Sequence, residues 1–382
     1  MRTTTPRVLV ISQRQLQPHV SWASSYEFED VVCAIDAADL VAVEPVHRTA
    51  PHWVNRVLSK LERQGGVRVS RIGGQKKINI TNAYDLLFVP LAGPQDVEIL
   101  DAVEGWQDRC RIKVCWIQEL WSSMLHYPKL LAPLQQFDHI FVGHAPTPEQ
   151  LSRLVRKPCS FLSYGVDALR FCPHPNPPLR SIDFYALGRR SPSTHSSLLE
   201  RCARNQDFHY VYDSARWTTL VDGHAQHREL TANLIKRSRY FMADRAKTDM
   251  PEQTNGEHVF GPRFFEGAAA GAVLVGDAPD CDTFRDYFDW PDAVIPFAYG
   301  SPGIGDLIDE LDADPTRLSR ARQANVGNTL ERHDWMYRWQ QVLDTVGMKS
   351  LPATEERRMA LQRRAQDVFS AQPRPRLISV AR

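Results

Sequence analysis

The chain has 382 residues, of which 43% are hydrophobic and 9% aromatic, a content that supplies two domain cores and excludes a wholly disordered chain. Its 46 Lys and Arg residues nearly balance its 45 Asp and Glu residues, so the charge excludes a nucleic-acid-binding protein held mainly by phosphate contacts. Seven scattered cysteines without a C-x-x-C pair indicate reduced thiols in a cytosolic protein, not a zinc site or a disulfide framework.

The amino-terminal stretch differs from a targeting segment. The apolar run in MRTTTPRVLVISQ is far too short for a secretory signal peptide, and no cleavage-site pattern follows it. No part of the sequence approaches the roughly 18 consecutive apolar residues of a transmembrane helix. We therefore expect a soluble, cytoplasmic protein without a transmembrane segment.

Short apolar runs bounded by polar or turn residues recur through the first half of the chain, at 7–12, 40–46, 67–72, 84–91, 113–118 and 139–144. Stretches with helical spacing lie between several of them, such as 51–66 and 94–110. Strands that alternate with helices are typical of βα units, and near-continuous apolar runs fit parallel strands that are covered on both faces. The first half therefore predicts an α/β domain with a mainly parallel sheet.

The composition changes near the middle of the chain. Four prolines interrupt the stretch 164–182, namely Pro173, Pro175, Pro177 and Pro178. Because proline cannot continue a helix or a central strand, we interpret this stretch as an interdomain linker. A second alternating series follows, with apolar runs at 183–189, 208–213, 239–244, 272–277 and 293–297.

Three helical stretches end the chain, at 314–332, 334–347 and 355–371. We predict one α/β domain at 1–165, a Pro-rich hinge at 166–180 and a second α/β domain at 181–348. A helix and tail at 349–382 complete the chain, and packing back on the first domain is one arrangement open to them.

Polar residues follow the strands of the second half, at the sheet edge where open α/β folds bind ligands. After the first of these strands, Gly188 permits a tight turn, and Ser191 with Pro192 resembles a helix N-cap and first helical residue. The free N–H groups of that helix, together with Arg189 and Arg190, suit a phosphate or diphosphate. An ordinary capped helix with two surface arginines fits the same residues.

A Gly- and Ala-rich helix is predicted from Gly261–Pro262 to a stop at Gly271, leading into an apolar strand that ends at Asp277. Arg263 and Glu266 share one face near its N-terminal end. The carboxylate can accept two hydrogen bonds from a vicinal diol such as a ribose. The alternative is a solvated ion pair between these two side chains.

His258 lies in the loop just before Arg263 and Glu266. A lone histidine is more often structural than catalytic, and only this position suggests a functional role for His258. In the first half, the stretch 115–128 follows a strand and contains Glu119 and His126 with an aromatic cluster of Trp116, Trp121 and Tyr127. A carboxylate and an imidazole beside aromatic rings suit a sugar-like acceptor, and the edge of a core would contain the same residue types.

Several motifs are absent from the sequence. No G-x-x-x-x-G-K-[ST] loop supports triphosphate hydrolysis, and no G-x-G-x-x-G follows the first strand as in dinucleotide oxidoreductases. No H-E-x-x-H motif or nucleophile elbow is present. No D-x-D in the first half would hold a metal–diphosphate.

Two stretches of the chain resemble signatures of GT-B glycosyltransferases. The hinge signature of these enzymes resembles YGVDALRFCP (164–173). Their donor-site helix and the strand after it resemble FGPRFFEGAAAGAVLVGD (260–277). The similarity is greatest to the family-1-like, spore-maturation-type branch. Residues 280–297 and RHDWMYRW (332–339) also resemble this branch, with His333 and Arg338 at matching places. The resemblance covers residues 160–345, whereas the first half matches only in its α/β rhythm.

The resemblance implies a GT-B fold, with two Rossmann-like, doubly wound domains that face a cleft. Glu266 matches the carboxylate that binds the donor ribose, and Arg189 or Arg190 matches the basic residue on the diphosphate. Asp277 belongs to the same donor-side segment. His258 stands where many retaining members have the first glutamate of a Glu-x7-Glu motif, and the usual diphosphate lysine is missing, so Arg263 is a candidate substitute.

The resemblance therefore implies a glycosyltransferase that moves a sugar from a nucleotide diphosphate-sugar to a glycan, a lipid-linked acceptor or a small molecule. Retention of configuration without an obligatory metal or other cofactor is expected, with residues 1–160 binding the acceptor. One rival is a non-catalytic GT-B-like binding protein in envelope assembly, and another is a sugar-nucleotide epimerase. The basic helix 355–371 either touches an anionic membrane from the cytoplasmic side or is an ordinary packed helix.

Overall fold

The computed structural model describes residues 6–45, 75–213 and 223–371. The helix expected at 51–66 and the strand expected at 67–72 lie outside the described residues. Within the described ranges, no helix combines the length and the apolar character that crossing a membrane requires.

A six-stranded parallel sheet organises the first half of the chain, as predicted. Its order is β2-β1-β4-β6-β7-β8, and every pairing between neighbours is parallel. The strands are β1 (Val8–Ser12), β2 (Ala38–Ala42), β4 (Tyr84–Leu91), β6 (Cys110–Ile117), β7 (His139–Val142) and β8 (Cys159–Phe161). β1 is buried along its whole length because helices cover both faces of the sheet.

A second parallel sheet of five strands, in the order β10-β9-β11-β12-β13, organises the second half. Each of its strands overlaps one of the five predicted apolar runs, and β9 and β11 begin one residue earlier than predicted. They are β9 (Ile182–Ala186), β10 (Tyr210–Tyr212), β11 (Ser238–Met242), β12 (Val273–Gly276) and β13 (Ile295–Pro296). Both sheets are therefore doubly wound α/β units, with β1 and β9 in interior positions.

Helices connect the strands and cover the sheets. In the first half these are η1 (Val20–Trp22), α1 (Ala23–Ile35), η2 (Pro94–Ala102), α3 (Trp106–Arg109), η3 (Ser122–His126), α4 (Pro128–Leu131), η4 (Ala132–Gln136), α5 (Pro148–Val155) and α6 (Ala168–Phe171). In the second half they are α7 (Pro192–Arg204), α8 (His224–Lys236), α9 (Pro251–Thr254), α10 (Pro262–Ala269), α11 (Asp282–Tyr287), α12 (Ile304–Asp312), α13 (Pro315–Arg332), α14 (Trp335–Thr345) and α15 (Pro352–Ser370).

The stretch 94–110 is not the continuous helix that its spacing suggests. It forms the 3-10 helix η2, a short strand β5 (Val103–Glu104) that pairs with β3 (Ile78–Asn79), and the four-residue helix α3. Gly105 has a φ of 84° and separates β5 from α3. This left-handed backbone breaks the helical path that the apolar spacing alone would continue.

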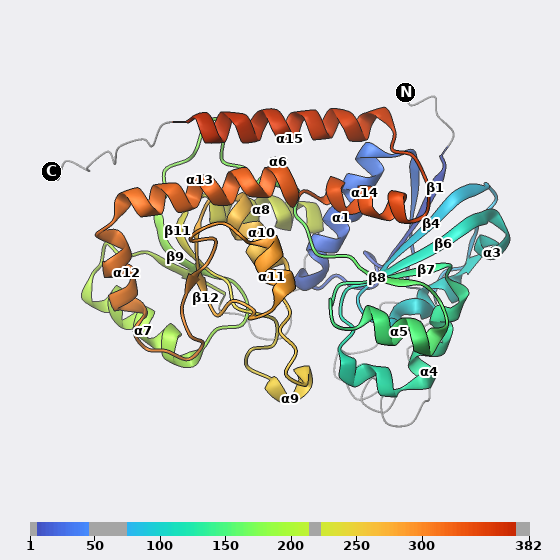
Figure 1. The fold of residues 1–382 in the computed structure, drawn as a ribbon, viewed down its shortest axis with the longest axis horizontal. Coiled ribbons are helices and arrows are strands. Elements are labelled where there is room, and N and C mark those ends of the chain that lie inside the picture. Colours follow the sequence, from blue (N-terminus) through green and yellow to red (C-terminus); the bar gives the residue numbers. More distant parts are fainter. Residues whose placement is uncertain (1–5, 46–74, 214–222, 372–382) are drawn as a thin grey trace.

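The end of the chain returns to the first domain. α13 lies on the second domain, or lobe, whereas α14 packs on α1 of the first, and α15 starts beside α1 and runs back over α13 (Figure 1). Phe28 of α1 stacks on Trp335 of α14 with ring centroids 4.6 Å apart. A bridge between Val166 and Asp334 ties the segment that connects the two sheets to the start of α14.

One hydrophobic core is continuous across the two lobes. It extends from α1 and β1 through α14 to α10 and the inner face of the second sheet. Two further cores fill the remaining faces, one under the first sheet and one under the second. The C-terminal helices thus fix the two sheets to each other through packed apolar side chains.

Candidate functional site

The turn between β9 and α7 has the geometry that the sequence predicts. Gly188 has a φ of 76°, and its N–H donates to Asp213 Oδ2 over 2.6 Å. The predicted N-cap is confirmed, because Ser191 Oγ accepts from the Thr194 N–H at 3.4 Å and Pro192 is the first helical residue. The N-terminus of α7 therefore lies at the carboxyl ends of the strands.

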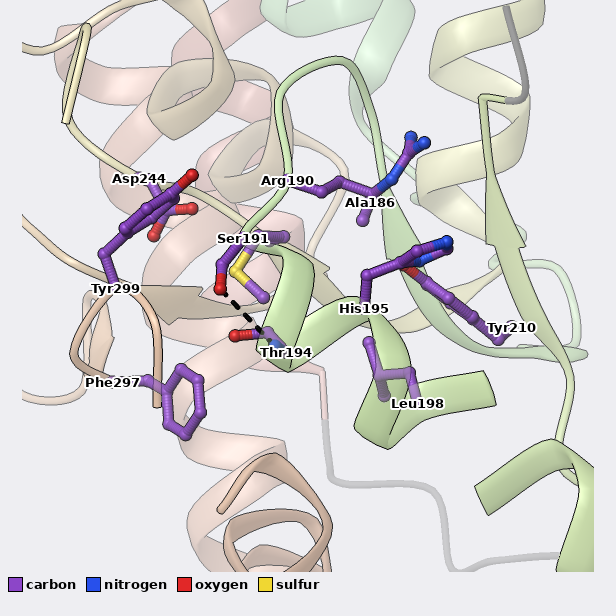
Figure 2. A pocket seen from close by; sticks show the side chains of 11 residues that line it. Ala186, Arg190, Ser191, Thr194, His195, Leu198, Tyr210, Asp244, Phe297 and Tyr299 are labelled. Atoms are coloured by element: carbon purple, nitrogen blue, oxygen red, sulfur yellow. Dashed lines mark hydrogen bonds between the residues drawn. The ribbon is translucent and has the colours of Figure 1, made fainter. Parts of the chain in front are cut away.

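A shallow pocket lies beside this end of α7 (Figure 2). Side chains from α7, β10 and the segments that follow β9, β11 and β13 line it, among them Ser191, His195, Tyr210, Asp244, Phe297 and Tyr299. The pocket combines aromatic rings, a carboxylate and a helix N-terminus. Its position between strand ends is the place where α/β sheets bind ligands.

Arg189 and Arg190 both have acidic or carbonyl partners. Arg189 is half-exposed and its Nη1 lies 3.0 Å from Asp249 Oδ1. Arg190 donates from Nη2 to the Asp213 carbonyl over 2.6 Å. Figure 2 shows the Arg190 guanidinium turned away from Ser191. Of the two, Arg190 is thus held at the end of β10, and Arg189 is held by a surface ion pair with Asp249 and a contact of its Nη1 with Met250 Sδ at 3.6 Å.

Arg263 differs from Arg189 and Arg190 in its surroundings. It lies in the first turn of α10, which starts at Pro262 after the N-cap Gly261, as predicted. A Cβ at Gly188 would lie 2.5 Å from Arg263 Nη2, so the guanidinium packs directly on the β9–α7 turn. Burial lowers the pKa of Arg263, with Asp244 and Glu266 opposing the shift. It forms no hydrogen bond or ion pair with any residue that the structure describes.

Glu266 is not the solvated ion-pair partner of Arg263 that spacing allowed. It is 4% exposed, and its Oε1 accepts from Arg228 Nη1 on α8. Its second oxygen, Oε2, has no hydrogen-bond partner within the described part of the chain. Sequence spacing could not reveal Arg228 as the partner, because it precedes Glu266 by 38 residues.

His258 and Asp277 are linked through a residue that the sequence did not single out. His258 Nδ1 accepts from the Asp280 N–H over 3.0 Å, and its Nε2 contacts Arg245 Nη1. Arg245 Nε lies 3.1 Å from Asp277 Oδ2, which also accepts from Thr248 Oγ1. The loop after β11 therefore carries the arginine that joins the two predicted site residues.

Glu119 of the first domain faces this same loop. Its Oε2 lies 3.5 Å from Lys247 Nζ, and Lys247 lies 4.8 Å from the centroid of the Trp121 ring. The Ser122 N–H donates to Glu257 Oε1 over 2.9 Å. The segments 119–122 and 247–257 therefore meet where the two domains face each other.

The other members of the predicted aromatic cluster lie elsewhere. Trp116 is fully buried in the core between β6 and α14, so it offers no surface to an acceptor. His126 and Tyr127 are exposed at the end of η3. The structure thus groups Glu119 and Trp121 with the second domain, and leaves His126 on the surface.

His144 lies just after β7, at the carboxyl edge of the first sheet where α/β folds bind ligands, and the sequence patterns did not single it out. It is 1% exposed, and its ring meets that of Trp121 edge-on at 4.4 Å. Burial, reinforced by the charge of Lys247, lowers the pKa of His144 to about 3. His144 Nδ1, Trp121 Nε1 and Glu257 Oε2 are buried without a hydrogen-bond partner among the described residues.

Comparison with known proteins identifies the second domain. A family model described as glycosyl transferase-like matches residues 189–344. Sucrose-phosphate synthase from Thermosynechococcus elongatus superposes with a TM-score of 0.51 and 12% identity, covering 90% of this chain and 98% of that chain. HepE of Anabaena, in a complex with UDP-glucose, has a TM-score of 0.48 and 11% identity, covering 89% of this chain and 99% of that chain. No curated protein sequence matches significantly.

The matched segment contains Arg263, Glu266 and Asp277 together with the whole of α7. The similarity in structure extends over both parallel sheets and shows the shared two-domain fold. Residues 189–344 are therefore similar to the glycosyl transferase-like family, and the chain has the two-domain GT-B fold that the resemblance of its second half implied.

Proposed function

We propose that the protein transfers a sugar from a nucleotide diphosphate-sugar, bound by the second domain, to a hydroxyl-bearing acceptor bound by the first. The observation that carries this proposal is Arg263. A half-buried guanidinium that forms no direct ion pair with any described residue lies against the β9–α7 turn. The charges of Asp244 and Glu266 compensate it only from a distance, and a diphosphate at the N-terminus of α7 would add direct, hydrogen-bonded partners.

The proposed roles follow from position. Arg263, Arg189 and the first N–H groups of α7 hold the diphosphate, and Glu266 Oε2 accepts from the ribose hydroxyls. His258 contacts the donor sugar or the diphosphate, with Asp277 fixing its neighbour Arg245. In the reaction the bond between the sugar C1 and the diphosphate oxygen breaks, the diphosphate leaves with the bonding electrons, and the acceptor oxygen bonds to C1.

Catalysis then depends on charge that is in place before the bond breaks. Donors aimed at the departing diphosphate stabilise its developing charge without reorganisation, and arginines supply that charge in a mechanism without a required metal. We propose retention of configuration at C1. Glu119 receives the acceptor hydroxyl proton, while the exposed His126 contacts a sugar or lipid-linked acceptor on the cytoplasmic side.

Binding measurements test this assignment. Calorimetry with UDP-glucose, GDP-mannose and dTDP-glucose should reveal one donor, and Arg263→Met should weaken its binding by about 10- to 100-fold, because a charge-assisted hydrogen bond contributes about 1.5–3 kcal/mol. Glu266→Gln should weaken the same donor. Arg285→Met is the control, since Arg285 pairs with Asp280 and Asp282 on the surface. Equal affinity of Arg263→Met and wild type would refute the donor site.

One observation favours a second candidate, a GT-B-like protein that binds nucleotide-sugars without turnover. Both ring nitrogens of His258 are engaged, by the Asp280 N–H and by Arg245, so neither is open to a donor sugar in this arrangement. A donor that binds but is neither transferred nor slowly hydrolysed, as measured by release of free nucleotide diphosphate, would select this candidate.

A further inference from the structure

Glu27 of the first domain is an unusually well-fixed carboxylate. It lies on α1, is fully buried, and accepts hydrogen bonds from five donors that reach it from outside that helix. The donors are Asp167 N at 3.0 Å, Arg170 Nη1 at 3.2 Å, Arg228 Nε and Nη2 at 3.0 Å each, and Trp335 Nε1 at 3.0 Å. They come from the connecting segment, α6, α8 and α14, so all of these elements hold Glu27 in one position.

Arg228 transmits this position to the second domain. Arg228 is 2% exposed, and its guanidinium donates two parallel hydrogen bonds to the Glu27 carboxylate. The guanidinium lies 4.7 Å from the centroid of the Phe171 ring. Burial opposes its charge, but Glu27 and Glu266 together raise the pKa of Arg228 above its usual range. A planar guanidinium held along one edge cannot rotate. It therefore presents a single nitrogen, Nη1, to Glu266.

We propose that Glu27 is a positioning residue for the donor-binding carboxylate Glu266, acting through Arg228. This inference rests on the proposed function, in which Glu266 Oε2 binds the donor ribose. With Glu27 in place, Arg228 occupies only Oε1. Without that charge, Arg228 is free to turn and bind both oxygens of Glu266, the bidentate geometry that guanidinium and carboxylate prefer. The oxygen that the ribose needs would then be covered.

The test compares Glu27→Gln with Glu29→Gln in the full chain. Both residues are fully buried on α1, but Glu29 pairs with Arg14 and Ser12 and has no contact with Arg228. Calorimetry uses whichever of UDP-glucose, GDP-mannose and dTDP-glucose binds wild type. We expect Glu27→Gln to weaken donor binding at least tenfold and Glu29→Gln to change it less than twofold.

Binding of inorganic diphosphate distinguishes a loss of Glu266 positioning from general disruption of the donor site. Inorganic diphosphate lacks the ribose, so its binding does not depend on Glu266. Glu27→Gln should bind inorganic diphosphate as wild type does. The double variant Glu27→Gln/Arg228→Gln removes the guanidinium that would cover Glu266, so donor affinity should return to within about threefold of wild type. If Glu27→Gln does not fold, as judged by circular dichroism, the double variant is compared directly with wild type and the same recovery is required.

Glu266→Gln distinguishes this inference from the proposed function. If it leaves donor binding unchanged, or if wild type binds no nucleotide-sugar, the proposed function fails. If Glu266→Gln weakens donor binding but Glu27→Gln does not, the donor site stands and the positioning role is wrong. Loss of diphosphate binding in Glu27→Gln, or a double variant as weak as the single one, would equally overturn the positioning role.

Discussion

At the scale of single residues, buried His144 makes the stability of the protein depend on pH. Its pKa is lowered to about 3 by burial and by the charge of Lys247, whereas a histidine in the unfolded chain titrates near 6.5. Between these values the unfolded state binds a proton that the folded state does not. The free energy of unfolding is therefore independent of this group above about pH 6.5, and it decreases as the pH falls from 6.5 towards 3.

Replacing His144 with glutamine should remove this component. Between pH 7.5 and pH 5 we expect wild type to lose about 2 kcal/mol more unfolding free energy than His144→Gln, from about 1.4 kcal/mol per pH unit below 6.5. Urea unfolding at the two pH values measures both losses, and other buried histidines affect both proteins equally. His126→Gln, at an exposed position, should behave as wild type. Identical pH dependence in His144→Gln would contradict the assignment.

At the scale of one element, the close approach of α10 to the sheet depends on Gly267. A Cβ at this position would lie 2.2 Å from Leu274 Cδ2 and 2.7 Å from Phe241 Cδ1, both in the core. Gly267→Ala should therefore cost about 1–3 kcal/mol, as overpacking does, even though alanine favours the helix by about 1 kcal/mol. Urea unfolding measures this cost. Gly261→Ala on the same helix meets no atom within 4 Å and should lose much less.

The sequence predicted elements well where local chemistry determines them. The N-cap Ser191, the helix start at Pro262 and the left-handed Gly271 after α10 follow from capping and turn preferences, and all three are confirmed. The five predicted apolar runs of the second half each overlap one strand of the second sheet. Helix α1 was missed because its sequence has no separate apolar and polar faces. Ser24, Glu27 and Glu29 are buried beside its hydrophobic residues, so no helical periodicity of apolar residues is visible.

The site was less predictable because its partners are remote in sequence. Spacing paired Glu266 with Arg263, three residues away, but the actual partner Arg228 lies on another helix and depends in turn on Glu27 in another domain. No periodicity records a contact between residues that are 201 positions apart. The family resemblance pointed to Glu266, and only the packing of α8 against α1 and α10 shows how it is held.

At the scale of the whole molecule, α15 connects the two lobes by charge as well as by apolar packing. Leu361, Ala365 and Val368 belong to the core that spans both lobes, so the apolar side of this helix is already covered by protein. At its other end, Thr354 Oγ1 donates to the Ile35 carbonyl of α1 over 3.2 Å. Through these contacts the helix acts as a brace between α13 and α1.

The ionic part of this brace is Arg357, and its loss should destabilise the protein. Arg357 Nη2 lies 2.7 Å from Asp167 Oδ1, and its Nε lies 2.8 Å from Asp334 Oδ1. Because the Asp334 side chain is fully buried, Arg357→Met leaves a buried carboxylate without its cation, which costs about 3–5 kcal/mol. Arg363→Met on the same helix replaces an exposed arginine and is the matched control, for which we expect less than about 0.5 kcal/mol.

Urea unfolding followed by tryptophan fluorescence and by circular dichroism distinguishes a brace from a local contact. If Arg357 couples the lobes, Arg357→Met should lower the midpoint and separate the two signals into distinct transitions, because cooperative unfolding requires the lobes to share stabilising contacts. Trp335 and Trp339 lie on α14 between the lobes, so their fluorescence should change in the first transition. A single coincident transition with a wild-type midpoint would show that the apolar core alone joins the lobes, since only the ionic contacts would have been removed.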